Sequence, residues 1–241
     1  MSGLFIMRDG RHGAKGTVEA WDLPTRLFKW MLVLLVAMAW LSDKYGVATP
    51  EWHKWNGYTI LVLIVFRLLW GFFGGVTARF SSFFPTPQRI FGYCGALVQG
   101  RKLPYLGHNP LGACMVLLLL AAVFCQAVLG LYSADPDRLV IEGPLSGTLS
   151  DASVDEASHV HRLGFDFLLI LIGLHVLANL AYDLIGKEGM IRAMVVGRKP
   201  AALYADMPRS APGSLWLAFT CLIAAVILVF GGIFLLGGRS L

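Results

Sequence analysis

The sequence predicts an all-α membrane protein in which four helices form a transmembrane bundle and a fifth transmembrane helix follows. The first reason is composition: 56% of the 241 residues are hydrophobic and only 15% are charged, which is outside the range of soluble domains. The second reason is that the apolar residues fall into five runs, each close to the roughly 20 residues that cross a bilayer as a helix. The runs are approximately Leu27–Leu41, Gly57–Phe73, Leu111–Leu131, Leu163–Ile185 and Leu215–Leu236.

Charged residues between the runs predict the orientation of the chain. Lysine and arginine dominate the N-terminal segment and the links after the second and fourth runs, whereas the loop over residues 133–158, after the third run, is acidic and carries Arg138 alone as its basic residue. The positive-inside rule therefore predicts a cytoplasmic N-terminus, and five spans then leave the C-terminus in the periplasm. We expect a cytoplasmic tail over residues 1–20, the bundle over 21–200, and a linker with the fifth span over 201–241. The net charge of +5 does not indicate nucleic-acid binding, because the distribution of charge reports orientation instead; membrane lipids are an expected partner of the spans.

The first two helices have clear start signals. Asp22 can cap the first helix, and Pro24 fits its first turn, where a missing N–H costs nothing; this helix is expected to end near Asp43. The second helix enters the membrane on the outer side at His53. Arg67 follows fourteen residues later on the same face, near the cytoplasmic end, where it either snorkels to the interface or pairs with a carboxylate.

The remaining segments carry weaker signals. Residues 74–110 form a long inner link, in which Ile90–Val98 is expected to be a short helix on the membrane surface. Residues 133–158 form an acidic outer loop, which is either a docking surface for a partner or a solvated loop. The fifth span has no ionisable residue and is expected to pack or anchor. The four cysteines form no CxxC or CxxCH motif, so a covalently attached haem and a zinc site are not predicted.

The fourth run, with its flank from Ser158 to Ile185, carries the residues that most require a function. His161 and His175 lie fourteen residues apart, so they point nearly the same way on a helix and are separated by about 21 Å along its axis. Ionisable groups inside a bilayer are costly and usually functional. His159 lies on roughly the opposite face and is expected in the aqueous boundary. One face with two imidazoles at two depths suits two cofactors stacked across the membrane.

Matching depths predict which groups meet. His53 and His161 both begin helices on the outer side, and an iron porphyrin held between two helices takes axial imidazoles at one depth. His175 lies toward the cytoplasmic half, where Lys29 on the first helix and His108 before the third are the available partners. No carboxylate or thiolate cluster accompanies these residues, which disfavours a metal site without porphyrin.

Several stretches resemble the bacterial cytochrome b561 and nickel–iron hydrogenase cytochrome b family. They are WDLPTRLFKW, WHKWNGYTILVLIVFRLLWGFFG, YLGHNPLGA, SHVHRLGFDFLLILIGLHV and GMIRAMVVGRKP, in the family's order over roughly residues 20–200. The resemblance implies a b-type cytochrome with two haems in the bacterial inner membrane. Such a protein passes electrons between the quinone pool and a redox partner, often periplasmic: a c-type cytochrome, a hydrogenase or a dehydrogenase subunit.

The resemblance assigns His53 and His161 to the outer haem iron and His175 to the inner one. The family pattern in the first motif reads RLFHW, whereas this chain has Lys29 in place of the histidine. Three outcomes are possible. In the first, Lys29 is the fourth ligand. In the second, His108 or another group replaces it, or the iron is five-coordinate; in the third, the inner haem is absent. We favour Lys29, because it holds the matching position in an otherwise intact motif. Burial and the metal both favour the neutral amine that ligation requires.

Arg26, which precedes Lys29 in the same motif, and Arg67 complete the expected cofactor-binding residues. Asp166 and Asn179 are further polar groups on the fourth helix that lie near the expected cofactors or bond to a neighbouring helix.

The leading hypothesis is an electron-transfer subunit of an oxidoreductase complex. The alternatives are a stand-alone quinone reductase that acts on a small oxidant such as superoxide, and a membrane anchor without redox activity. Co-purification of a redox partner would favour the electron-transfer subunit. Loss of haem colour on purification would favour the membrane anchor.

Overall fold

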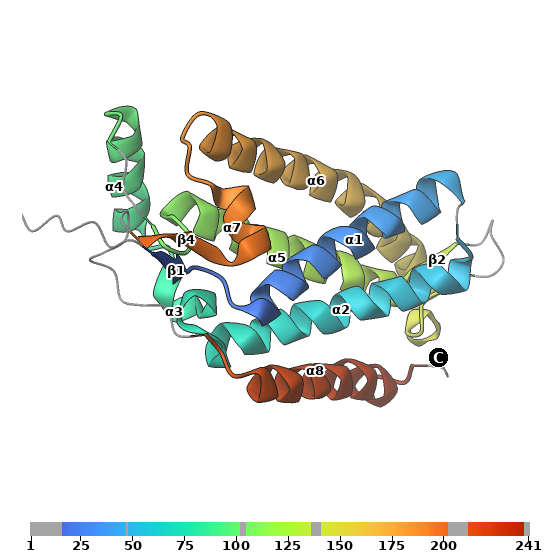
Figure 1. Cartoon of the computed structure of the whole chain (residues 1–241). Coiled ribbons are helices and arrows are strands. Elements are labelled where there is room, and N and C mark those ends of the chain that lie inside the picture. The colour runs from blue at the N-terminus through green and yellow to red at the C-terminus, as the bar shows by residue number, and fades with distance from the viewer. Residues whose placement is uncertain (1–15, 47, 102–104, 136–140, 202–211, 239–241) are drawn as a thin grey trace, which may run out of the picture.

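The computed structural model describes residues 16–46, 48–101, 105–135, 141–201 and 212–238. Within these ranges, five helices are long and apolar enough to cross a membrane. They are α1 (Leu23–Tyr45), α2 (Pro50–Phe73), α5 (Pro110–Tyr132), α6 (Asp151–Leu184) and α8 (Leu215–Leu235). All five run along one common direction (Figure 1). The predicted all-α membrane fold with five spans is therefore confirmed.

The spanning helices begin at polar caps, three of them followed by proline. Asp22 accepts a hydrogen bond from the backbone N–H of Thr25 at 3.0 Å, as predicted for the start of α1. Thr49 and Asn109 cap α2 and α5 in the same way, each with a proline in the first turn. Proline suits this position because the first N–H groups of a helix have no partner within it. The caps fix where each span starts and hence the depth of the residues that follow.

Helix α2 is the centre of the bundle. It packs against α1, α5 and α8, and α5 packs in turn against α6. Ile64 and Trp70, both on α2, are fully buried. The Trp70 indole N–H donates a hydrogen bond to the carboxylate of Asp22 at the start of α1. In the part of the chain that the structure describes, α1 and α6 do not form an extensive contact with each other. The two helices that carry Lys29, His161 and His175 are therefore held in place by their neighbours, not by each other.

Short elements close the end of the bundle where α1 begins. They are the 3₁₀ turn η1 (Val76–Ala78), α3 (Phe80–Phe83), α4 (Pro87–Val98), α7 (Met190–Val196) and the strands β1 (Thr17–Glu19) and β4 (Arg198–Pro200). The two strands pair antiparallel, with Val18 opposite Lys199. The Gly197 carbonyl then accepts the N–H groups of Ala20 and Trp21 at 2.8 and 3.0 Å. Gly197 has φ +84, and a Cβ there would lie 2.8 Å from the Trp21 carbonyl oxygen, so this close approach requires glycine.

Two segments differ from the sequence-based expectation. Residues 17–19, assigned to the N-terminal tail, form β1, because β4 offers an edge with which they hydrogen-bond; residues 1–15 of that tail lie outside the described residues. The last eight residues of the acidic loop are helical, since α6 already starts at Asp151, capped by Ser150 and with an acidic residue in its first turn. Before it, β2 (Ala134–Asp135) and β3 (Ile141–Glu142) form a small hairpin, followed by the 3₁₀ turn η3 (Ser146–Thr148). The expected short helix at Ile90–Val98 is confirmed as part of α4.

Candidate functional site

The candidate site residues gather at the two ends of the bundle. We call the region around Ser42, His53 and His161, where α1 ends and α2 and α6 begin, the His53 end. We call the region around Lys29, Arg67 and His108, where α1 begins and α2 ends, the Lys29 end. His175 interacts electrostatically with Lys29, so it belongs with the Lys29 end. The depth argument from the sequence predicts the same grouping.

The hydrogen bonds at His53 favour a proton on its Nδ1 nitrogen. The buried Ser42 hydroxyl lies 3.2 Å from Nδ1 of His53 and donates its own proton to the Ala39 carbonyl at 2.9 Å. A hydroxyl has one proton to donate, so Ser42 accepts the second bond and Nδ1 of His53 is the donor. In a neutral imidazole the lone pair then resides on Nε2, the nitrogen that a metal would take.

His161 has the same tautomer for an independent reason. Its Nδ1 lies 3.0 Å from the backbone carbonyl of Gln126 on α5, and a carbonyl can only accept. The Gln126 side chain completes a clamp by donating to the His161 carbonyl at 2.8 Å. Gly130, one turn along α5, leaves room for the ring, because a Cβ there would lie 3.1 Å from Cε1 of His161. The ring of His161 is thus held in a fixed orientation by one neighbouring helix.

The two imidazoles at the His53 end form a pair. They come from α2 and α6, which enter the bundle at this end, and they lie within range of electrostatic interaction. In the described ranges no group of three or more His, Cys, Asp or Glu side chains converges as a metal site. Two imidazoles with lone pairs on Nε2 suit an iron porphyrin, since the macrocycle supplies the other four nitrogens. The donor set at the His53 end therefore fits a haem with two axial histidines.

Lys29, like His108, lies within electrostatic range of His175 at the Lys29 end of the bundle. Its Nζ lies 3.6 Å from the centroid of the Trp21 ring and is buried without a hydrogen-bond partner among the described residues. His175 lies on α6 beside Asn179. The Asn179 amide nitrogen is 3.2 Å from Nε2 of His175, and it donates a hydrogen bond to the backbone carbonyl of His175 at 2.7 Å. A buried amine without a partner is costly, and a metal ion or a carboxylate would remove that cost.

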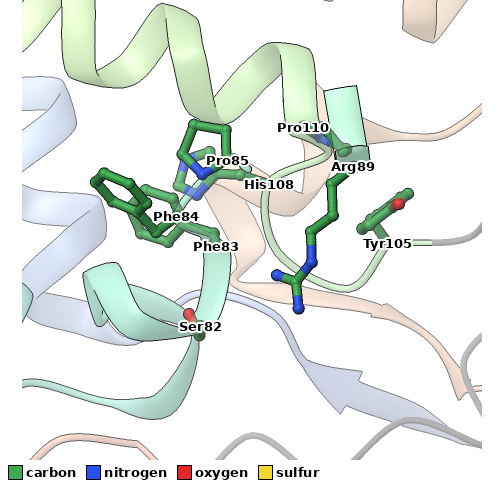
Figure 2. Close-up of a pocket in the computed structure, with 8 residues that line it drawn as sticks. All are labelled: Ser82, Phe83, Phe84, Pro85, Arg89, Tyr105, His108 and Pro110. Atoms are coloured by element: carbon green, nitrogen blue, oxygen red, sulfur yellow. The ribbon is translucent and has the colours of Figure 1, made fainter. Parts of the chain in front are cut away.

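His108 is enclosed by aromatic rings. The centroids of Trp21 and Phe83 each lie 4.6 Å from that of His108. Burial first, and then the nearby cations Lys29 and Arg67, hold the pKa of His108 well below its usual range, so the ring is neutral. Figure 2 shows His108 behind Phe83 and Pro85 in a pocket that the bases of α4 and α5 border. The pocket is lined by Ser82, Phe83, Phe84, Pro85, Arg89, Tyr105, His108 and Pro110.

Two arginines at the Lys29 end also have unpartnered N–H groups. Arg67 is 2% exposed and donates from Nη2 to the Ala78 carbonyl at 3.1 Å, while its buried Nη1 has no partner in the described part of the chain. Arg26 donates from Nη1 to the Val195 carbonyl at 2.7 Å, and its Nε is likewise buried without a partner there. A guanidinium suits a carboxylate geometrically, so both arginines fit the acidic substituents of a haem.

Other sequence-predicted polar groups lie elsewhere. Asp166 is exposed on α6, and His159 is exposed as expected. Sequence reasoning gave no role to Ser42, Gln126, Gly130 or Trp21. Only Gln126 and Gly130 left a signal, as a polar and a small residue one turn apart in an otherwise apolar run.

Comparison with known proteins gives one consistent result. Residues 20–197 match the sequence model of a family described as prokaryotic cytochrome b561. A probable Ni/Fe-hydrogenase B-type cytochrome subunit of Rhizobium leguminosarum bv. viciae is 23% identical over 222 residues, covering 78% of this chain and 92% of that protein. A protein of the same description from Azotobacter vinelandii is 24% identical over 216 residues, covering 75% and 87%. The search of solved structures gave no match.

Proposed function

Because the chain belongs to the prokaryotic cytochrome b561 family, we propose that this membrane-bound b-type cytochrome carries two haems and passes electrons between quinone and a redox partner. The observation that carries the proposal is the pair His53 and His161, each with Nδ1 hydrogen-bonded to a neighbouring helix. When bound, haem supplies one-electron transfer. The chain's own residues orient the ligand nitrogens, exclude water and balance the charge of the acidic substituents.

The outer haem is proposed to be held by Nε2 of His53 and of His161. The hydrogen bonds to Ser42 and to the Gln126 carbonyl set the tautomer of each ring before haem arrives. A donor at Nδ1 also makes an imidazole a stronger ligand through its other nitrogen. This end thus needs little rearrangement to bind.

The inner haem is proposed to be held by His175 and Lys29. Lys29 lies within electrostatic range of His175, and its Nζ has no hydrogen bond in the described residues to give up; both statements also hold for His108 and its Nδ1. His108 is a weaker candidate, because aromatic rings enclose it on two sides. Arg26 and Arg67 are proposed to pair with the propionates.

The proposed partner is a nickel–iron hydrogenase, on the strength of the relatives' names. The chain would lie in the bacterial inner membrane, with the Lys29 end at the cytoplasmic side and the His53 end at the periplasmic side. The basic residues of the segments at the Lys29 end support this orientation through the positive-inside rule. Electrons from a periplasmic hydrogenase would then enter at the outer haem and reach quinone through the inner one.

The partner can be tested in membranes of the source bacterium. Deleting the chain is expected to abolish reduction of the quinone pool by hydrogen, while reduction by succinate, which uses a different enzyme, stays unchanged. Re-expression of the chain should restore the hydrogen-dependent reaction. If hydrogen still reduces the quinone pool at the normal rate, the hydrogenase is not the partner. The haem content of the purified chain tests the cytochrome assignment separately.

Ser42→Ala tests the setting of the outer ligand. Loss of the acceptor at Nδ1 weakens His53 as a donor to oxidised iron, so we expect the midpoint potential of one haem to rise by up to about 60 mV, which corresponds to a tenfold change for one electron. Haem content should stay unchanged. The control is Thr59→Ala on α2, which also removes a hydroxyl bonded to a helix carbonyl but touches no ligand. Equal potentials in Ser42→Ala and wild type, read by redox titration, would contradict the proposed role.

A further inference from the structure

The carboxylate of Asp22 joins the start of α1 to the end of α2. Besides the N–H of Thr25, it accepts hydrogen bonds from the indole Nε1 of Trp70 at 3.2 Å and from the backbone N–H of Gly75 at 3.3 Å. Trp70 lies in the last turn of α2 and Gly75 just beyond it. The two helix ends lie side by side (Figure 1), and Asp22 is only 3% exposed. The side chain is therefore enclosed between the two helices.

The hydrogen bonds at Asp22 suit a negatively charged carboxylate. Oδ1 accepts from the N–H of Thr25, and Oδ2 accepts from Trp70 and Gly75. A protonated acid would have to turn its O–H toward one of these N–H groups, whereas a carboxylate can accept from all of them. The three donors are neutral groups, so they stabilise the charge without cancelling it. Asp22 thus places a negative charge inside the Lys29 end of the bundle.

This charge lies beside the residues proposed to hold the inner haem. Asp22 is within electrostatic range of both Lys29 and Arg67. Lys29 follows Asp22 by seven residues, about two helical turns. Its Nζ lies over the ring of Trp21, the residue that precedes Asp22, at 3.6 Å from the centroid. Because Lys29 is in turn within range of His175, the carboxylate is close to the proposed position of the inner iron.

A fixed negative charge affects the two oxidation states of a nearby haem iron differently. Oxidised iron carries one more positive charge than reduced iron, so a carboxylate stabilises the oxidised form and lowers the midpoint potential. The effect is larger where water is excluded, because the local dielectric constant is lower there. The buried position of Asp22 therefore favours a measurable influence on the potential.

We propose that Asp22 lowers the midpoint potential of the inner haem through its buried negative charge. The inference rests on the inner haem of the proposed function and gives a role to a residue that is not itself a ligand. A lower potential favours the passage of an electron from the inner haem to quinone. The hydrogen bonds from Trp70 and Gly75 hold the charge in place.

The test is a redox titration of the full chain, purified with its haems and followed by absorbance and EPR. Asp22→Asn keeps the shape of the side chain and removes its charge. We expect one component to shift threefold to tenfold toward the reduced form, a rise of about 30 to 60 mV for one electron. The shifted component should be the one that His175→Ala removes. The other component and the content of two haems should stay unchanged.

Two control variants separate the charge from the contacts that it makes. Trp70→Phe removes the indole N–H that bonds to Asp22 but keeps the carboxylate, so the potentials should stay at the wild-type values. Asp183→Asn removes a half-buried carboxylate from α6 at the same end of the bundle. Like Asp22, Asp183 accepts backbone N–H groups, those of Met190 and Ile191. This variant should also leave both potentials unchanged.

The role of Asp22 is overturned if Asp22→Asn keeps two haems with unchanged potentials, a result that leaves the proposed function standing. It is also overturned if either control raises the same potential as much as Asp22→Asn does, because the cause would then not be the charge of Asp22. Loss of a haem from Asp22→Asn would likewise overturn it, since the residue would then shape the site. A single haem in the wild type would overturn both this role and the inner haem, and the haem count distinguishes that case.

Discussion

Replacing Lys29 with alanine is expected to lower the haem content of the purified chain from two per polypeptide to one. Alanine offers the proposed inner iron no ligand at this position. The outer pair lies at the other end of the bundle and has no contact with Lys29. Haem content by pyridine haemochrome and the low-spin signals in low-temperature EPR give the result.

Two further variants identify the ligand. Lys29→His restores the residue type that the family motif has at this position, so two haems are expected, with the EPR signal of a second bis-histidine centre. His108→Ala should keep two haems and the wild-type signals. If His108→Ala loses a haem while Lys29→Ala keeps both, His108 is the ligand and our assignment is wrong. A single haem in the wild type would mean that the inner site does not bind haem at all.

Replacing His161 with alanine is expected to remove the outer haem. This change deletes the imidazole proposed as an axial ligand, and it leaves the Gln126 carbonyl without the hydrogen bond that oriented that ring. His53→Ala should give the same loss through the other ligand. In a redox titration, one of two components should disappear, and electron transfer between a periplasmic partner and quinone should stop.

His159→Ala is the matched control for this prediction. His159 lies two residues before His161 on the same helix, but its side chain is exposed on another face. It should keep two haems and the wild-type potentials. If His159→Ala loses haem as His161→Ala does, the effect comes from disturbing the start of α6 and not from ligation. Retention of two haems by His161→Ala would exclude His161 as an axial ligand.

The sequence predicted the spans and the pairs of groups because both follow from position along a helix. Apolar runs fix five spans, and depth alone brings His53 to the level of His161 and Lys29 to that of His175. Start signals such as Asp22 and Pro24 are local and were predicted correctly. These features need no knowledge of how one helix is rotated against another.

The contacts between helices could not be predicted in the same way. The bond from His53 to Ser42 depends on the rotation of α1 against α2, and that from His161 to Gln126 on the close approach of α5 and α6. Strand β1 has three residues and no periodic pattern, so nothing in residues 17–19 predicted that they would pair with residues 198–200. Tertiary contacts decide such short strands.

The pairing of β1 with β4 also imposes an order on biosynthesis. Strand β1 leaves the ribosome about 180 residues before β4, an interval of roughly 10 to 40 s at ordinary rates of translation. Throughout that interval α1, α2, α5 and α6 enter the membrane while the bonds from Ala20 and Trp21 to Gly197 cannot form. These bonds therefore form only after four of the five long helices have been synthesised, and α8 follows them.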